Sequence, residues 1–438
     1  MAVVIGSTIG SGIFRSPAGI ADKLPGPLPM LMAWVVGGIF AICGALTIAE
    51  IASALPRTGG IYVFLRQGWG DLTAFLFGWS QFVMIRAASL GAIAITCSEY
   101  FFRVMGWDLS LVMPVRYVAA GAILLTATFN IVGVRVGATF TNFTVVAKYG
   151  GLLFIVIVAF AVGFPANGFS HFTPALPPGS VSVPAFGLAL VSTLWAFDGW
   201  ADISYNGGEV RDPQKNLPRA LIGGTLLVIG IYLAANVAYL TVLPIEEMRT
   251  SRLVAADVAE RVIGSAGVVF VSVTVMISTF GTLNAVLFTS PRVFFAMAED
   301  GLFFKKVAAV HPTFGTPWVA ILMTASLGAA FVLLRSFEQL ADAFVTAFLP
   351  FYFMAVASIF RLRRRADYQP AFKVPLYPLV PLLFMFAVLY LLGNALISPG
   401  SRWQTAGVLG VCLTGIPVYF LTVGRRGRRG LPGGAAKA

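Results

Sequence analysis

The chain has 438 residues, of which 58% are hydrophobic and 11% are charged, and its mean hydropathy is +0.87. Soluble domains carry about a quarter charged residues, so this composition excludes an ordinary soluble protein and indicates a polytopic membrane protein. The net charge of +12 does not favour a nucleic-acid-binding protein, because the basic residues are scattered through loops between apolar segments.

The first apolar segment contains an unusual run of small residues at 5–14, Ile-Gly-Ser-Thr-Ile-Gly-Ser-Gly-Ile-Phe. Glycine frees the backbone and hydroxyl side chains compete for its hydrogen bonds, so the run favours a break in the helix. In lipid, an unwound backbone is tolerated only where it is buried in protein or lines a cavity. The run therefore predicts a binding site near the bilayer midplane, or alternatively a small-residue face for helix packing.

The whole chain divides into apolar segments separated by short loops, and the loops alternate in basic content. The richer side carries Arg57, Arg66, Arg211, Lys215 and the run 361–365. By the positive-inside rule this side is cytoplasmic, as are both termini, including a basic tail at 425–438. The twelve predicted spans are 1–21, 29–54, 72–102, 112–132, 138–163, 184–206, 219–243, 265–290, 317–335, 341–361, 375–397 and 404–423.

A second anomalous centre lies in the sixth span, where residues 195–200 read Trp-Ala-Phe-Asp-Gly-Trp. Five spans separate the starts of the two anomalous segments, so the second runs in the opposite direction. This spacing predicts an all-α fold with a five-plus-five inverted repeat and two additional C-terminal spans. The first repeat covers 1–163, the second covers 184–362, and the extra spans cover 375–424.

The two breaks offer complementary groups for an amino acid. Free N–H groups at Ser11 and Gly12, aided by the helix dipole, suit a carboxylate. Carbonyls before the first break and in the second suit an ammonium group. The aromatic rings of the second break would form apolar walls and an occluding gate, unless they serve interfacial anchoring or core packing. The candidate substrate-binding residues are Ser7, Thr8, Ile9, Ser11, Gly12, Trp195, Ala196, Phe197, Asp198 and Trp200.

Two ionisable residues within spans are candidates for function, because buried charge in a membrane is costly. Lys148 in span five could brace the first break in place of a sodium ion, or its head could reach the membrane interface. Asp198 could select a cationic or hydroxylated side chain, carry a proton, or cap the following half-helix. Arg86 and Asp202 are expected to be structural or gate partners.

Other chemistries lack the residues that they need. The three cysteines and two histidines show no metal-ligand spacing, so neither a metal nor a cofactor is expected. The chain also lacks paired histidines and a nucleophile with a neighbouring base, which argues against an enzyme.

Five motifs resemble those of the amino acid–polyamine–organocation (APC) superfamily, most closely its L-type amino acid transporter branch and the stand-alone bacterial relatives of that branch. The resemblance covers nearly the whole chain. The motifs are Gly-Ser-Gly-Ile-Phe at 10–14, Ala-Glu-Ile at 49–51 with Leu-Pro-Arg-Thr-Gly-Gly-Ile-Tyr at 55–62, Trp-Ala-Phe-Asp-Gly-Trp at 195–200, Gly-Glu-Val-Arg-Asp-Pro-Gln-Lys-Asn-Leu-Pro-Arg at 208–219, and Ala-Met-Ala-Glu-Asp-Gly at 296–301 with His-Pro at 311–312 and Gly-Thr-Pro at 315–317.

The resemblance implies a leucine-transporter-type fold and sodium-independent movement of amino acids across the plasma membrane, often by exchange. It implies that Ser11 and Gly12 bind the substrate carboxylate and that Lys148 stands where related sodium-coupled carriers hold an ion. It also implies an inner gate at 56–62, which includes Arg57, together with Glu209. Trp195 is a separate gate candidate, as an occluding aromatic side chain of the second break.

Two features depart from the family pattern. The loop 106–110, Gly-Trp-Asp-Leu-Ser, lacks the cysteine with which animal members bind a single-span glycoprotein, so no disulfide-linked heavy chain is expected. Asp198 replaces the small residue of several carriers of large neutral amino acids, so neutral and cationic substrates both stay open.

The sequence leaves the transport mode open between exchange, facilitated diffusion and proton coupling. The leading hypothesis is alternating access, in which the substrate bridges the two breaks. A proton-coupled symporter that selects cationic amino acids through Asp198 is the first alternative, and a substrate-gated sensor or channel is a remote one.

Overall fold

The computed structural model describes residues 2–304, 306–307 and 309–423, and within these ranges the fold is helical with no strand. A single isolated bridge joins Thr58 to Asn206. The predicted basic tail at 425–438 lies outside the described residues.

The longer helices follow the apolar segments of the sequence closely. They are α1 (Ala2–Thr8), α2 (Gly12–Lys23), α3 (Pro27–Ala54), α4 (Ile61–Trp69), α5 (Asp71–Ser80), α6 (Arg86–Met105), α7 (Val112–Val132), α8 (Val134–Asn167), α9 (Val183–Phe197), α10 (Pro213–Val242), α11 (Ile245–Thr250), α12 (Val254–Ile263), α13 (Ser265–Glu299), α14 (Trp318–Leu334), α15 (Phe337–Leu362), α16 (Leu379–Ile397), α17 (Arg402–Leu413) and α18 (Gly415–Thr422). Short turns complete the set, namely a π-helix η1 (Gln81–Ile85) and the 3₁₀ turns η2 (Ser170–Phe172), η3 (Asp202–Tyr205) and η4 (Gly207–Glu209).

Nine helical segments in the described chain are long and apolar enough to cross a membrane, with α5–η1–α6 and α17–α18 each counted as one. Two shorter apolar helices, α9 and α14, accompany them. The first predicted span is divided into α1 and α2, because the residues between them leave the helical conformation. The structure is therefore a multi-helix bundle in which the apolar segments at 1–21 and 184–206 are the irregular ones.

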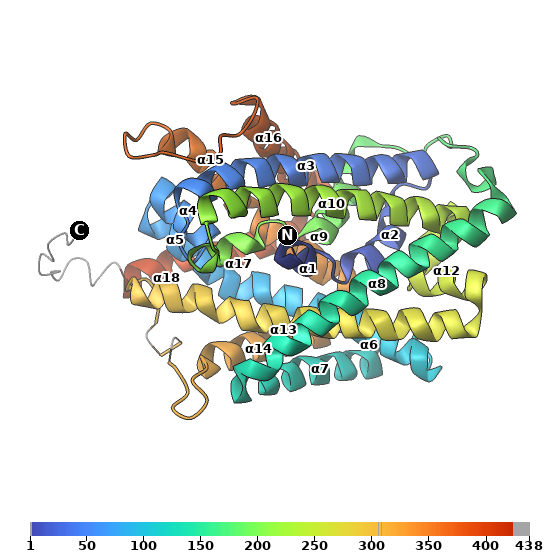
Figure 1. The fold of residues 1–438 in the computed structure, drawn as a ribbon, viewed down its shortest axis with the longest axis horizontal. Helices are drawn as coiled ribbons and strands as arrows, with labels where there is room; N and C mark the ends of the chain where they lie inside the picture. The colour runs from blue at the N-terminus through green and yellow to red at the C-terminus, as the bar shows by residue number, and fades with distance from the viewer. Residues whose placement is uncertain (1, 305, 308, 424–438) are drawn as a thin grey trace, which may run out of the picture.

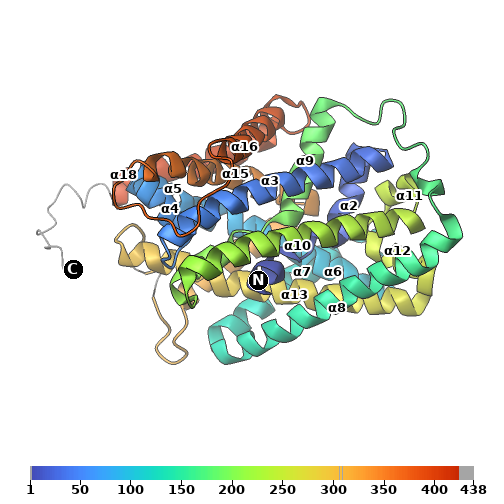
Figure 2. The same cartoon turned by 45° about the horizontal axis from the view of Figure 1, so that its top comes forward.

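The broken segment lies inside the bundle. In Figures 1 and 2, α1 is near the centre of the view, among the long helices α3, α10, α8 and α13. Contacts join α1 to α10, α10 to α3 and α8, and α13 to α6 and α8. A seven-residue helix has little stability of its own, so these surrounding helices must hold α1 in place.

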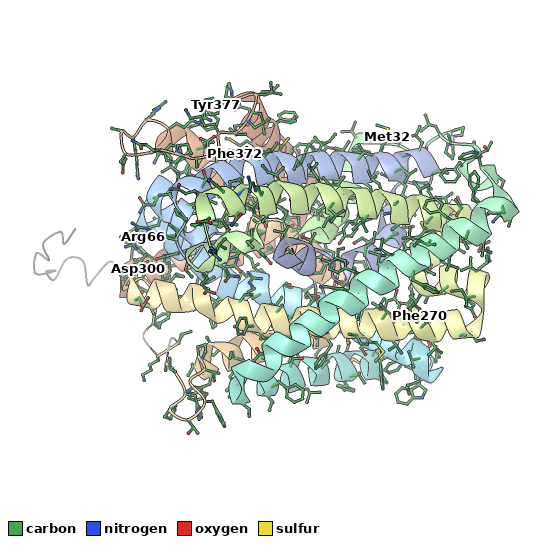
Figure 3. The ribbon with its side chains drawn as sticks, in the orientation of Figure 1. Met32, Arg66, Phe270, Asp300, Phe372 and Tyr377 are labelled. Atoms are coloured by element: carbon green, nitrogen blue, oxygen red, sulfur yellow. The ribbon has the colours of Figure 1, made fainter. Side chains whose placement is uncertain are left out.

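One end of the bundle, here called the basic end, carries Arg57, Arg66 and the run 361–365. There α4 is joined to the end of α13 through Asp300: Arg66 Nη1 lies 2.7 Å from Asp300 Oδ1, and the Tyr62 hydroxyl donates to Asp300 Oδ2 at 2.6 Å. Figure 3 shows Arg66 and Asp300 side by side at this end. Burial, followed by the bond to Asp300, raises the pKa of Tyr62, so this hydroxyl remains a donor at neutral pH.

Candidate functional site

The first break spans Ile9 to Ser11, between α1 and α2. Thr8 ends α1 and its carbonyl accepts from the N–H of Gly10 at 2.9 Å, which closes a tight turn. The backbone then enters α2 at Gly12, a 12-residue helix with Ser11 at its N-cap. The Ser11 side chain does not cap the helix, and its buried Oγ has no hydrogen-bond partner among the described residues. The site thus holds an open hydroxyl beside the positive end of a helix.

Three side-chain hydrogen bonds fix α1 in position. The Tyr232 hydroxyl of α10 donates to the Thr8 carbonyl at 2.9 Å, and Lys148 Nζ of α8 donates to the Gly6 carbonyl. The Ser7 hydroxyl donates to the Gly199 carbonyl of the second break at 3.1 Å. Lys148 is 3% exposed, so its ammonium group lies inside the bundle and is bonded to the helix that precedes the first break.

The second break begins where α9 ends at Phe197. Asp198 leaves the helical conformation, and Gly199 follows with φ +104°. A Cβ on Gly199 would lie 2.8 Å from backbone atoms of Ser7 and Thr8, so glycine is required for the two breaks to touch. The predicted continuation of span six as a half-helix is wrong, because the chain continues in the 3₁₀ turns η3 and η4. Asp198 is the C-cap residue of α9 and is followed by no α-helix that it could cap at the N-terminus.

A pocket lies between the two breaks. Its walls come from four parts of the chain, namely the first break, the second break, α6 and α13. The lining residues are Ser7, Thr8, Gly10, Ser11, Gly12, Arg86, Ser89, Ile93, Trp195, Asp198, Asp202, Thr282 and Val286.

Three charged side chains line this pocket: the carboxylates of Asp198 and Asp202 and the guanidinium of Arg86. Asp198 Oδ1 accepts from the Tyr352 hydroxyl of α15 at 3.0 Å. Arg86 follows the π-helix η1 directly, and its buried Nε has no partner in the described chain. Single π-turns within α-helices are frequent at functional sites. The charges of this group sum to minus one when all three are ionised.

The side of the pocket away from the basic end is closed by two layers of side chains. The indole of Trp195 packs edge-on against Phe337 and Phe344, with ring centroids 6.0 and 5.1 Å apart. Beyond it, Arg15 lies 3.2 Å from Glu99 and 3.0 Å from Glu338. These contacts join α2, α6, α9 and α15 on this side of the pocket.

Comparison with known proteins gives the family of this chain. Residues 1–416 match the family model described as amino acid permease. The chain belongs to the amino acid permease family. The permease is 34% identical to the serine/threonine exchanger SteT of Bacillus subtilis over 96% of this chain and 94% of that protein. It is 30% identical to the human b(0,+)-type amino acid transporter 1, over 97% of this chain and 86% of the relative. It is 31% identical to the mouse large neutral amino acids transporter small subunit 2, over 96% and 79%.

Family membership and the apolar helices establish the permease as a multi-pass protein of the plasma membrane. The structure brings six of the ten predicted substrate-binding residues to the wall of the pocket. These are Ser7, Thr8, Ser11, Gly12, Trp195 and Asp198.

The other predicted site residues of the permease pack behind the pocket. Ala196 faces Gly12, where a Cβ on Gly12 would lie 2.4 Å from the Ala196 Cα. Phe197 packs on Trp34 and Tyr232, while Trp200 stacks on Tyr352 at 5.1 Å. Ile9 is likewise buried and is not among the lining residues. These four support the breaks rather than form the pocket wall.

The predicted gate residues Arg57 and Glu209 both lie exposed at the basic end. Their segments are neighbours, since Thr58 bridges Asn206 and the Gly59 N–H donates to the Tyr205 carbonyl at 3.0 Å. The structure thus joins the loop after α3 to the turns that follow the second break.

Several residues at this site could not be anticipated from the amino-acid pattern. Ser89, Ile93, Thr282 and Val286 line the pocket from α6 and α13, and nothing in the regular apolar pattern of those spans marks them. Tyr232 and Tyr352 contact the breaks from outside. A tyrosine in the middle of an apolar span was the available signal, because a buried hydroxyl needs a hydrogen-bond partner.

The part of the chain that the structure describes contains no group of three or more His, Cys, Asp or Glu side chains that could hold a metal ion.

Proposed function

We propose that this permease is a sodium-independent secondary transporter that exchanges L-amino acids across the plasma membrane by alternating access. The observation that carries the proposal is the pocket between the two breaks, with the unpartnered Ser11 hydroxyl at the start of α2. Its relatives named as a serine/threonine exchanger and as amino acid transporters support the same substrate class.

The substrate carboxylate binds the Ser11 hydroxyl and the N–H groups at Ser11 and Gly12, where the helix dipole favours negative charge. The substrate ammonium binds carbonyl oxygens of the breaks. The Thr8 carbonyl already accepts two hydrogen bonds, from Gly10 and Tyr232, so the Ile9 carbonyl and the Asp198 carboxylate are the better acceptors. Lys148 supplies the positive charge that a sodium ion would otherwise provide beside α1.

The proposal includes twelve membrane spans with both termini in the cytoplasm. The nine long segments, the shorter α9 and α14, and the broken α1–α2 segment support this number. A five-plus-five inverted repeat follows, with 1–163 and 184–362 as its halves and 375–424 as two further spans. The positions of the two breaks, each in the first span of its half, support the repeat.

Alternating access needs a closure on each side of the pocket. On the outer side, Trp195 and the Arg15 ion pairs form it. On the cytoplasmic side, the segment with Arg57 and the turn with Glu209 form it, supported by the Thr58–Asn206 bridge. A bound amino acid contacts both breaks, so it allows the helices on either side of the pocket to move together.

The test is counterflow into proteoliposomes that contain the purified full chain. We expect saturable uptake of a labelled L-amino acid that increases when the lumen holds unlabelled substrate and is unchanged when choline replaces sodium. Absence of uptake for all twenty amino acids by folded protein would refute the proposal.

A second candidate is proton-coupled symport of cationic amino acids selected by Asp198. The net negative charge of Asp198, Asp202 and Arg86, when all three are ionised, favours this candidate. A negative group complements a positively charged substrate side chain or a proton. Uptake of lysine driven by an imposed pH gradient, into vesicles without internal amino acid, would support this candidate. Planar-bilayer recording separates both carriers from a substrate-gated channel, whose conductance would far exceed carrier turnover.

We expect the permease to be a transporter and not an enzyme, and to have no disulfide-linked heavy chain. The three cysteines, Cys43, Cys97 and Cys412, are buried within helices, where an extracellular chain has no access. The purified chain alone should therefore be competent for transport.

A further inference from the structure

The loop between α15 and α16, residues 363–378, is fixed to the side of α3 by a buried carboxylate. Glu50 of α3 accepts two hydrogen bonds from the Arg363 guanidinium, at 2.8 and 2.6 Å. It also accepts from the Val374 N–H at 2.6 Å and from the Tyr368 hydroxyl at 3.3 Å. The Glu50 side chain is fully buried, so a carboxylate at this position requires these donors.

Two further contacts hold the loop. The Phe372 N–H donates to the Ser53 hydroxyl at 3.3 Å, and the Arg363 guanidinium lies over the Tyr377 ring at 3.7 Å. Figure 3 shows Phe372 and Tyr377 on the outer side of α3, where the loop covers the bundle. The loop therefore presents a defined surface instead of a variable one.

One exposed residue of this loop is apolar and has an unfavourable backbone conformation. Leu376 has φ +48°, which non-glycine residues rarely adopt, and 73% of the residue is exposed. It lies directly before the exposed apolar residues of α16, which include Leu379, Leu383 and Phe386, and its carbonyl accepts from the Leu379 N–H at 2.7 Å. Because the exposed apolar residues of a membrane span contact lipid, Leu376 adds an exposed apolar side chain at the start of that span.

The same loop also carries exposed basic side chains. Arg364 and Lys373 are both exposed, and no described residue forms an ion pair or hydrogen bond with either side chain. Arg365 is also exposed, but its guanidinium donates to the side chain and carbonyl of Gln67. The loop thus has one exposed apolar side chain, Leu376, beside the start of a membrane span. It also has two cations, Arg364 and Lys373, that lack partners in the described chain.

We propose that the loop 363–378 binds the headgroup of an anionic phospholipid, with Arg364 and Lys373 on the phosphate and Leu376 among the acyl chains. The position of the exposed Leu376 at the start of the membrane span α16 favours a lipid over an acidic soluble protein, which would leave this leucine without an apolar environment. The proposal is independent of the transport activity, because its test measures only lipid binding.

The test is native mass spectrometry of the full chain released from nanodiscs of phosphatidylcholine with an added fraction of phosphatidylglycerol. The wild-type protein should retain phosphatidylglycerol in preference to phosphatidylcholine. In the double variant Arg364→Gln/Lys373→Gln this preference should fall by about fivefold for each cation. The matched control is Arg335→Gln/Arg402→Gln, which removes the same charge from two exposed residues at the other end of the bundle. Arg335 directly follows α14, and Arg402 begins α17.

Leu376→Asn tests the apolar part, because asparagine tolerates the left-handed backbone while removing the apolar side chain. It should weaken retention of phosphatidylglycerol, whereas soluble glycerophosphoglycerol should fail to compete with the lipid. Equal retention of the two lipids by the wild type, or equal losses in the test and control double variants, would overturn the proposal. Competition by the soluble headgroup would identify a phosphate site that does not recognise lipid.

Discussion

The two breaks at the pocket are built from different residues and are held differently. The first, at Ile9–Ser11, lies between two α-helices and contains small residues that expose the backbone and one hydroxyl. The second, at 198–201, follows an α-helix but leads into 3₁₀ turns, and it carries a carboxylate between aromatic side chains. Lys148 and Tyr232 bond to α1, directly before the first break, whereas Tyr352 bonds to Asp198 in the second.

This difference suggests a division of roles within the proposed site. A hydroxyl beside a helix N-terminus can bind the carboxylate that every amino acid carries. A carboxylate beside aromatic rings can distinguish one side chain from another. Variants of the first break should therefore affect all substrates alike, and variants of the second should change their ranking.

The largest effect is expected from Gly12→Val. A Cβ at Gly12 would lie 2.4 Å from the Ala196 Cα, and backbone cannot move aside as a flexible side chain does. The variant should abolish uptake of every amino acid in proteoliposomes. Its control is Gly10→Ala, where the new Cβ would meet the Thr282 side chain at an ordinary 3.6 Å and uptake should persist. Normal uptake by Gly12→Val would contradict the close contact of the breaks.

Lys148→Ala should nearly abolish transport while leaving the protein folded. The substitution removes the buried charge that bonds to the Gly6 carbonyl, so α1 loses one of its three anchors. Initial uptake rates and the size-exclusion profile are the measurements. Lys23→Ala is the matched control, because that lysine bonds to the Gly19 carbonyl and the Ser192 hydroxyl, away from the first break. Near-normal rates in Lys148→Ala would show that the first break does not need this ammonium group.

Asp198→Asn should change the affinity for some substrates more than for others, unlike variants of the first break. If the carboxylate binds a cationic side chain, the apparent affinity for lysine or arginine should fall by about 10- to 100-fold, the range for a hydrogen bond to a charged group. The apparent affinity for alanine should change much less. Tyr352→Phe is the control, because it keeps the carboxylate and removes only its 3.0 Å donor. Equal losses for lysine and alanine in competition assays would reject selection by Asp198.

Ser11→Ala should give the smallest and most uniform effect. It removes the buried hydroxyl that has no partner among the described residues, but leaves the N–H groups at the start of α2. The KM for neutral and cationic amino acids should rise together by about tenfold, the lower value for a hydrogen bond to a charged group. A change confined to one substrate class would assign side-chain selection to the first break as well.

Much of the site could be predicted from residue types alone. The small residues at 5–14 and the interrupted aromatic run at 195–200 indicated both irregular segments, and the structure departs from regular helix at each. Six of the ten candidate substrate residues line the pocket. Phe197 and Trp200 do not, because an aromatic side chain beside a break can face either the pocket or the helices behind it, and sequence does not record that choice.

The sequence by itself determined that this chain is a membrane-embedded helical protein with two interrupted spans, because hydropathy and glycine content act locally along the backbone. Only the tertiary structure decided which distant groups meet there. Arg86 and Thr282 reach the pocket from α6 and α13, and Gly199 touches Ser7 across nearly two hundred residues. Such contacts depend on how helices pack and rotate against one another, and the apolar pattern of a buried span leaves that rotation undefined.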